Sequence, residues 1–446
     1  MKFRFYLSLI FFTVFLLYNN LYGQQSRNQE KRNPPQLRFI RAYGATDETK
    51  APIIVLENNK SSYNAKFGGK SITIEFDIAT EVPPSMFAKF IHCSADWQES
   101  ENVFLNDFVN LRTSNIDWES APTGQNYYGY RGRIKIPNSQ VNFTYAGNWK
   151  VKLYDYSNDT VEFAETRFFV VNPRVDCQMS FSSEFYSSKF PIANAALNIE
   201  SEVTTDQILM ESSLNTLVIY KNHRWFEPYP ISNSENNNFS QVLYRYNFPI
   251  MINGFLSLGK RFRIERLPSE NGYRVIDLSD VASYPQVNSV VRLPFADIRR
   301  RGSFDDNDDD GAMITNNIIP SYDGYIFLEF VMEPDNWHTK ENIYVVGSFN
   351  NWIADENWKM NYDEKDRYYK LRQWVRRGRH NYLYATGTYN AITQKPQKLS
   401  YDEYEGNTSA AAHTYLCFVY YHESDYGGYD SIIGLGAATI NGNINR

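Results

Sequence analysis

Short runs in which apolar and polar residues alternate one by one recur along this chain, and this period of two constrains its fold more than any other feature. Residues 71–78 (SITIEFDI) place four apolar side chains on one face of an extended strand: Ile72, Ile74, Phe76 and Ile78. Residues 148–154 (NWKVKLY) repeat the alternation, and 167–171 (RFFVV) form another strand-like run before a turn. Several short strands separated by turn residues predict a β-sandwich.

The composition favours strands along the whole chain. Of 446 residues, 34 are Tyr, 30 are Phe and 8 are Trp, and aromatic rings pack well on a pleated sheet. Segments in which apolar residues recur with the 3.6-residue period of a helix are scarce. We therefore predict an all-β chain of tandem immunoglobulin-like β-sandwich domains.

The first residues predict export. Lys2 and Arg4 precede an apolar run at residues 5–18, and Leu21-Tyr22-Gly23 offers a cleavage site. The run is shorter than the ~20 residues that a membrane-spanning helix needs, and a retained anchor is the alternative. Residues 24–36 are polar and contain two prolines, which is typical of a flexible leader.

Turn-rich and acidic stretches suggest where the remaining chain divides. We expect five segments: a signal peptide at 1–23, a flexible leader at 24–37, an N-terminal β-sandwich at 38–173, a middle β domain with an Asp-rich loop at 174–318, and a C-terminal immunoglobulin-like or early-set β-sandwich at 319–446.

Charge and motifs exclude several classes of protein. The formal net charge is −6 with both signs interspersed, whereas a nucleic-acid-binding protein needs a concentrated basic face. The sequence contains neither G-x-S-x-G nor H-E-x-x-H, the motifs of two large hydrolase classes. We predict that the protein is no enzyme and, calcium excepted, takes no cofactor.

His92 and Cys93, in residues 90–97 (FIHCSADW), look like the base and the nucleophile of an enzyme. Neighbouring side chains on a strand point to opposite faces, so this pair cannot make the ~3 Å hydrogen bond of such a dyad. Cys93 is expected among apolar neighbours, as an unreactive thiol. With Cys177 and Cys417 it makes three buried free thiols, and a Cys93–Cys177 bridge is the alternative.

The acidic stretch at residues 304–311 (FDDNDDDG) indicates a metal site. Asp306, Asp308 and Asp310, followed by Gly311, fit the start of a calcium loop, D-x-[DN]-x-[DN]-G. Asn317 stands at the twelfth position, where such loops carry a bidentate Glu. The three aspartates are therefore a candidate for weak calcium binding, and a metal-free loop is the alternative.

Residues 347–352 (GSFNNW) and 378–382 (GRHNY) resemble the immunoglobulin-like glycogen-binding modules, which are early-set sandwiches. In those modules a tryptophan stacks on a sugar ring, a role that the resemblance gives to Trp352. Leu383 stands where the modules have a lysine. The resemblance implies a sandwich with Trp352 partly in its core, and carbohydrate (glucan) binding is the alternative function.

Two sets of stretches, one near each end of the chain, carry a further resemblance. In the first sandwich they are 90–97 (FIHCSADW), 105–108 (LNDF) and 146–155 (AGNWKVKLYD). In the last region they are 404–406 (YEG), 415–421 (YLCFVYY) and 429–434 (YDSIIG). Together they resemble the plug proteins of the type IX secretion system, an exported β-sandwich family of Bacteroidota with an HC[DS]ADW motif.

The resemblance implies a non-enzymatic periplasmic protein that is attached peripherally to the outer-membrane translocon. Such a plug docks on the periplasmic mouth of the giant translocon barrel, seals it, and is coupled indirectly to a cargo-shuttling barrel. Neither a nucleic acid nor a catalytic substrate is expected as a partner.

Overall fold

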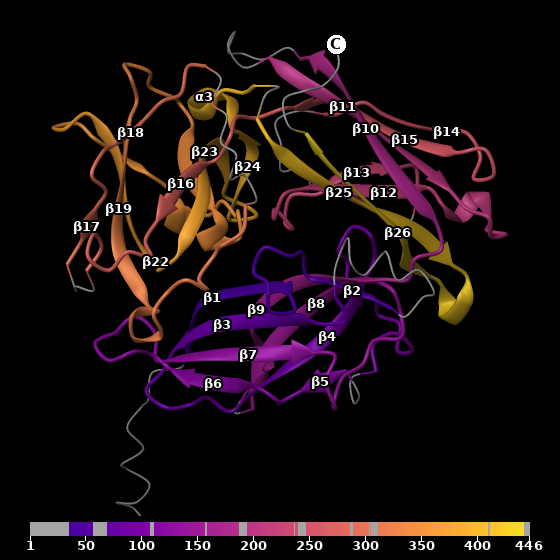
Figure 1. Cartoon of the computed structure of the whole chain (residues 1–446), viewed down its shortest axis with the longest axis horizontal. Coiled ribbons are helices and arrows are strands. Elements are labelled where there is room, and N and C mark those ends of the chain that lie inside the picture. Colours follow the sequence, from indigo (N-terminus) through magenta and orange to yellow (C-terminus); the bar gives the residue numbers. More distant parts are fainter. Residues whose placement is uncertain are drawn as a thin grey trace, which may run out of the picture. The chain divides into compact units, whose positions relative to one another are not determined.

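The computed structural model describes residues 35–56, 69–107, 111–156, 158–186, 194–235, 237–239, 247–285, 289–302, 304, 311–408 and 411–440. The expected signal peptide and most of the leader lie outside these ranges. The regular secondary structure is almost all β, with 51% strand and 5% helix, which confirms the all-β prediction (Figure 1). Among them, no helix has both the length and the apolar character needed to cross a membrane.

The first sandwich contains a sheet of order β1-β3-β7-β6. Its strands are β1 (Gln36–Gly44), β3 (Ile72–Ala79), β7 (Tyr130–Ile136) and β6 (Asp117–Ser120). The four apolar residues of the SITIEFDI stretch lie in β3 and are fully buried in the core of this sandwich, together with Trp149 and Phe168 of the facing sheet. The alternation in the sequence thus correctly gave the face of β3 that packs inward.

The facing sheet is long and serves two sandwiches. Its order is β13-β12-β25-β26-β9-β8-β4-β5, with β2 paired to β9. The strands are β2 (Ile53–Val55), β4 (Met86–Cys93), β5 (Arg112–Thr113), β8 (Gly147–Asp155), β9 (Asn158–Val171), β12 (Thr216–Lys221), β13 (Tyr229–Ser232), β25 (His413–Glu423) and β26 (Tyr429–Ile440). Strands β4, β8 and β9 cover the first core, whereas β12, β25 and β26 cover the second.

The second sandwich closes with a sheet of order β10-β11-β15-β14. Its strands are β10 (Asp176–Phe185), β11 (Ala195–Thr204), β14 (Ile250–Asn253) and β15 (Lys260–Pro268). Apolar residues of this sheet, such as Ile199 and Phe262, pack with Leu217, Cys417 and Ile433 of the long sheet.

The third sandwich has two sheets of its own. One has the order β16-β23-β20 with β24 on β23, and the other has the order β17-β19-β22-β21 with β18 on β19. The strands are β16 (Arg274–Asp277), β17 (Val291–Arg292), β18 (Asp297–Ile298), β19 (Tyr325–Glu333), β20 (Asn342–Gly347), β21 (Asn361–Asp363), β22 (Tyr368–Arg376), β23 (Arg379–Asn390) and β24 (Lys395–Ser400).

Helices among the described residues are single turns. They are α3 (Asp402–Glu405) and the 3-10 turns η1 (Glu211–Ser213), η2 (Pro320–Tyr322), η3 (Ser348–Asn350), η4 (Glu356–Trp358) and η5 (Asp425–Gly427).

Strand pairing crosses the expected boundary at residues 318/319 in both directions. The hairpin β25–β26, from the last region, pairs with β12 and β9, and its yellow ribbon runs beside β12 in Figure 1. Conversely, β16 and β17, from the middle region, join the third sandwich. The expected division into five segments stays a prediction, but residues 37–446 form one compact unit.

Candidate functional site

The strand that carries His92 and Cys93, β4, is buried on both faces. Cys93 lies in a core with Trp97 and Phe169, whereas His92 meets the Trp149 ring edge-on, with 5.2 Å between ring centroids. Burial raises the pKa of Cys93 to about 12 and lowers the pKa of His92 to about 4. A protonated thiol and a neutral imidazole on opposite faces form no catalytic dyad, as strand geometry predicted.

Polar side chains of β8, β25 and β26 meet the backbone just after β4 and join the first sandwich to the hairpin β25–β26. The Asn148 Nδ2 atom donates to the Ser94 carbonyl (2.9 Å), and its Oδ1 accepts from the Tyr420 hydroxyl (2.7 Å). Asp430, at the start of β26, accepts a bond of 2.9 Å from the Ala95 N–H. The stretches FIHCSADW, AGNWKVKLYD and YDSIIG therefore meet at one junction.

Gly147 lets β8 approach β4 closely at this junction. Its φ is 144°, and a Cβ atom there would lie 2.3 Å from the His92 Nε2 atom. That nitrogen lies 3.2 Å from the Ala146 carbonyl oxygen, so the imidazole fills the space that a side chain would need. Glycine is thus required for both its backbone angle and its size.

Trp352 is buried in the third sandwich and is 2% exposed. Its indole N–H donates to the Gly311 carbonyl (3.0 Å), its ring contacts that of Tyr273, and the Arg224 guanidinium lies 4.8 Å from the ring centroid. The ring therefore offers no free face to a sugar. The glucan-binding alternative loses the residue on which it depended, whereas the expected core position of Trp352 is observed.

The calcium candidates Asp306, Asp308 and Asp310 lie outside the described residues, so calcium binding stays a prediction. Within the described part of the chain, no group of three or more His, Cys, Asp or Glu side chains is arranged to hold a metal ion. Gly311, which ends the acidic stretch, donates its N–H to the Asn381 Oδ1 atom (3.2 Å) and is thereby fixed to β23.

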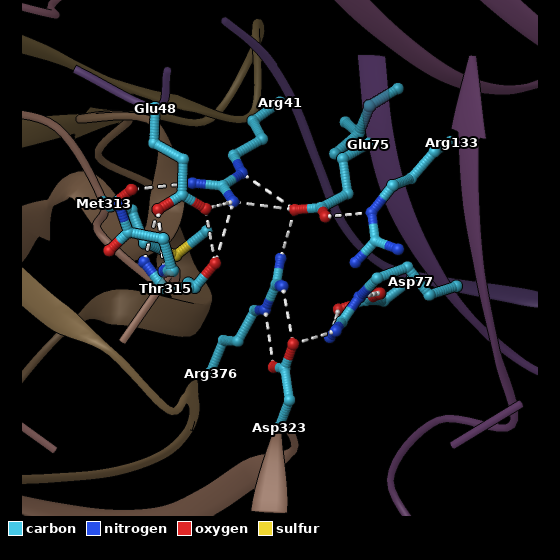
Figure 2. A network of polar contacts seen from close by, with 12 residues as sticks. Arg41, Glu48, Glu75, Asp77, Arg133, Met313, Thr315, Asp323 and Arg376 are labelled. Atoms are coloured by element: carbon cyan, nitrogen blue, oxygen red, sulfur yellow. Dashed lines mark hydrogen bonds and ion pairs between the residues drawn. The ribbon is translucent and has the colours of Figure 1, made fainter. Parts of the chain in front are cut away.

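A network of buried charges links the first sandwich to the third, and Glu75 lies at its centre (Figure 2). The Glu75 Oε1 atom accepts from Arg41 of β1 (2.8 Å) and from Arg376 of β22. Its Oε2 atom accepts from Arg133 of β7 (2.8 Å). Guanidinium groups from three strands thus meet on a carboxylate that is 2% exposed.

Asp323, just after η2, continues this network. It accepts hydrogen bonds from Arg376 and from Arg131 of β7. Arg131 also donates to both carboxylate oxygens of Asp77 (2.6 and 3.1 Å), and the Tyr325 hydroxyl donates to the same group (2.8 Å). Asp77 and Arg131 of the first sandwich are thereby joined to Asp323 and Tyr325, near the start of β19.

Glu48 closes the other end of the network. Its carboxylate pairs with Arg41 and accepts the backbone N–H groups of Thr315 (2.5 Å) and Asn316 (3.1 Å). Arg41 in turn donates to the Met313 carbonyl (2.7 Å). The segment that follows the acidic stretch is therefore held on the first sandwich.

The arginines of this network stabilise the ionised form of its acids. Burial alone would raise the pKa of Glu75, but Arg376 and Arg41 outweigh it and hold that pKa well below its usual range. Burial is likewise outweighed at Asp323 by Arg376 and Arg131, which lower its pKa. Both acids stay ionised at neutral pH and fully paired, so they suit a structural lock rather than proton transfer.

The sequence reasoning missed this network, although a signal was present. Thr73, Glu75 and Asp77 alternate with the apolar residues of β3 and therefore point to its other face. On the paired strand β7, Arg133 lies opposite Glu75 and Arg131 opposite Asp77. The sequence shows these residues as E-F-D and R-G-R, an alternation of charges that indicates cross-strand ion pairs on the second face of the sheet.

A second buried network ties β12 to the third sandwich. Arg224 donates to Glu270 (2.7 Å) and to Glu227 (3.2 Å), and Lys221 donates to Glu270 (2.9 Å). The Tyr401 hydroxyl donates to Glu227 (2.7 Å). Burial opposes the charge of Glu270, but Arg224 and Lys221 overcome it and lower its pKa.

Apolar side chains are exposed where the β14–β15 hairpin turns. Phe255 and Leu258 are 63% and 81% exposed, and Ile208 and Met210 are exposed on the loop between β11 and η1. Glu211 connects the two segments, since its carboxylate accepts the Leu256 N–H and its carbonyl accepts from Lys260. We call Ile208, Met210, Phe255 and Leu258 the apolar tip. Exposed apolar groups that gather in this way mark interaction sites.

Fold and junctions together define a multi-sandwich all-β protein whose parts are locked by buried ion pairs. Residues 37–172 match the family model described as the first domain of type 9 secretion system plug proteins. The first sandwich of this chain is therefore similar to that domain family, and the match points to a role related to type IX secretion. The similar stretches at residues 404–434 lie outside the matched range.

Solved structures support the fold. A hypothetical protein from Parabacteroides merdae, whose crystal structure was determined at 2.30 Å, superposes with a TM-score of 0.70 and 19% identity. The match covers 92% of this chain and 98% of that one, so the fold is shared along almost the whole length.

More distant similarities carry no inference. Dpr2 Ig1-Ig2 in complex with DIP-Theta (8% identity, 53% of this chain, 89% of that one) and the purple acid phosphatase PPD1 of yellow lupin (9%, 53% and 36%) both have a TM-score of 0.15. No curated protein matches the sequence.

Proposed function

We propose that the protein is a periplasmic plug, which docks on the periplasmic mouth of the outer-membrane channel of the type IX secretion system and seals it. The observation that carries this proposal is the match of residues 37–172 to the first domain of plug proteins. The rest of the chain continues the same architecture, because β9 of that domain pairs with β26 in one long sheet. In this role the protein acts by binding and catalyses no reaction.

A seal must keep its shape while it covers a wide opening, and the buried charges suit that need. Glu75 and Asp323 tie the first sandwich to the third, and Glu270 ties β12 to the same part of the chain. Removing one partner from a buried pair leaves an uncompensated charge, so these contacts resist separation of the sandwiches. A plug of this kind gates the channel if it binds the closed state more tightly than the open one.

We further propose that the apolar tip contacts the channel. Phe255 and Leu258 are large, exposed and held on a short hairpin, which restricts the freedom that binding would otherwise have to remove. Aromatic and aliphatic side chains on such a support are typical of the central part of a protein interface.

An affinity pulldown from outer membranes solubilised in mild detergent tests this proposal. The wild-type protein should recover a very large outer-membrane protein, and the double variant Phe255→Ser/Leu258→Ser should recover at least about tenfold less. Phe295→Ser is the matched control, because Phe295 is 84% exposed on the loop between β17 and β18. Absence of the large protein from the wild-type sample contradicts plugging. Equal loss in both variants contradicts the assignment of the tip.

A further inference from the structure

Two of the three cysteines, Cys177 of β10 and Cys417 of β25, lie in contact although they are 240 positions apart. Their Sγ atoms are separated by 3.2 Å, whereas Cys93 lies in another core with its Sγ directed to the Ile91 carbonyl. A disulfide needs the two sulfurs about 2.05 Å apart, so a shift of about 1 Å would join them. The bridge considered from the sequence, Cys93–Cys177, does not match this arrangement.

Strand β26 provides the space in which the two sulfurs meet. Gly436 pairs with Cys417, and a Cβ atom at Gly436 would lie 2.7 Å from the Cys417 Sγ and 3.1 Å from the Cys177 Sγ. Two residues earlier on β26, a Cβ atom at Gly434 would lie 2.3 Å from the side chain of Val175, which directly precedes β10. The two glycines thus allow β10 to pack closely against β26.

Glycine is needed at these two positions of β26 because there is no room for a side chain. No left-handed backbone angle is found at Gly434 or Gly436. Other residues could adopt the backbone there, but their side chains would occupy the volume that Cys177 and Cys417 share.

We propose that Cys177 and Cys417 form a disulfide bond in the exported protein. The bond would link the sheet of the second sandwich to the long sheet, and it would enclose the whole third sandwich in one covalent loop. This inference uses the export predicted from the sequence, since disulfides persist in oxidising compartments. It does not depend on docking to a channel.

The bond forms by thiol–disulfide exchange with a disulfide donor, such as oxidised glutathione or an oxidised dithiol protein. Cys177 reacts first because it is only partly buried, whereas Cys417 has no exposed surface. The Cys177 thiolate attacks the donor and forms a mixed disulfide. The Cys417 thiolate then attacks the Cys177 sulfur and expels the second donor thiolate. Two electrons and two protons thereby pass to the donor, which becomes two thiols.

The local environment makes this reaction slow at neutral pH. The hydrogen bond with Cys417 and burial raise the pKa of Cys177 well above its usual range, so little thiolate is present. Formation should therefore speed up as the pH rises toward 9.

Thiol counting in denaturant tests the proposal on the wild-type chain. After equilibration with reduced and oxidised glutathione, iodoacetamide should modify one cysteine, Cys93, and all three after reduction. Peptide mapping should recover a Cys177–Cys417 linked pair, and the Cys93→Ala control should show no free thiol before reduction. Three free thiols after oxidation, or a linked pair that contains Cys93, would overturn the proposal.

Thermal unfolding provides a second readout that needs no cysteine variant to fold. The disulfide closes a long loop, so the oxidised wild-type protein should melt about 5 °C above the reduced protein. Cys177→Ala, if it folds, should melt at the same temperature with and without reductant. A wild-type melting temperature that reductant leaves unchanged contradicts the bond. A failed pulldown would leave these results unaffected, so the two proposals fail independently.

Discussion

Arg376 and Glu75 lie 301 positions apart in the sequence, yet the guanidinium donates a hydrogen bond to the carboxylate where both side chains are 2% exposed. Arg376 belongs to β22 of the third sandwich and Glu75 to β3 of the first. This contact and the neighbouring ion pairs hold the first and third sandwiches together. A rigid seal requires such a lock.

Glu75→Gln should destabilise the protein by about 3–5 kcal/mol, because Arg41 and Arg376, both buried, would each lose one of their two carboxylate partners. Urea unfolding measures the loss. Glu119→Gln is the control, since Glu119 pairs with Arg133 while 49% exposed, and its loss should stay below about 1 kcal/mol. Equal effects of the two substitutions would show that the buried network contributes no more than a surface pair.

Stability should fall on acidification from about pH 6.5. Burial lowers the pKa of His92 and of His380 from 6.5 to about 4. The unfolded chain therefore takes up protons first, and stability that is fully present above pH 6.5 is lost between pH 6.5 and 4, by up to about 3 kcal/mol per histidine. Glu75 and Glu270, whose pKa values are also lowered, extend the loss below pH 4.5.

Melting temperatures measured from pH 8 to 4 test whether stability falls as the pH is lowered. His422 acts in the opposite direction, because its hydrogen bond to Asp430 raises its pKa and stabilises the protein in acid. His422→Asn should therefore make the decline slightly steeper. A melting temperature that is constant between pH 7 and 4.5 would contradict the assignment of neutral buried histidines.

Gly147→Ala should destabilise the junction between β4 and β8 by at least about 2 kcal/mol. The added Cβ atom would collide with the His92 ring, and the φ of 144° is strained for alanine. Gly302→Ala is the matched control, with nothing within 4 Å of the added atom and an expected change within about 0.5 kcal/mol. Thermal unfolding compares the two, and indistinguishable melting temperatures would disprove the close approach at Gly147.

Trp352→Ala should cost about 3–5 kcal/mol of stability, because it empties a core position and removes the hydrogen bond to Gly311. Electrophoresis in gels containing soluble glucan should show no retardation of the wild-type protein. Tyr389→Ala, at a 40% exposed aromatic of β23, should cost about 1 kcal/mol or less. Retardation that disappears in Trp352→Ala with stability unchanged would restore the sugar-binding role.

Local pattern allowed several strands to be predicted, and for some of them the face that packs inward. The period of two in SITIEFDI correctly placed Ile72 and Ile74 in a core, and the same reasoning separated His92 from Cys93. Alternation shows which side chains of one strand point to the same face, and therefore which face packs into a core. This follows from side-chain direction along the strand alone.

Partners that are distant in the sequence could not be predicted from it. Nothing in residues 413–440 indicates that β25 pairs with β12 and β26 with β9, because pairing depends on which edges the assembled sheets leave open. The buried partners of Glu75 and Asp77 could not be predicted for a related reason. In a sequence, a polar strand face looks like one that is exposed to solvent. Only the structure shows that the third sandwich, with Arg376, covers this one.

Conductance measures most directly whether the protein seals a channel, as proposed. The purified outer-membrane channel of type IX secretion would be reconstituted into planar lipid bilayers, and current recorded before and after the protein is added to the periplasmic side. The account predicts a large fall in conductance that is reversed by washing and is weaker with Phe255→Ser/Leu258→Ser. A conductance that stays unchanged at saturating protein would contradict it.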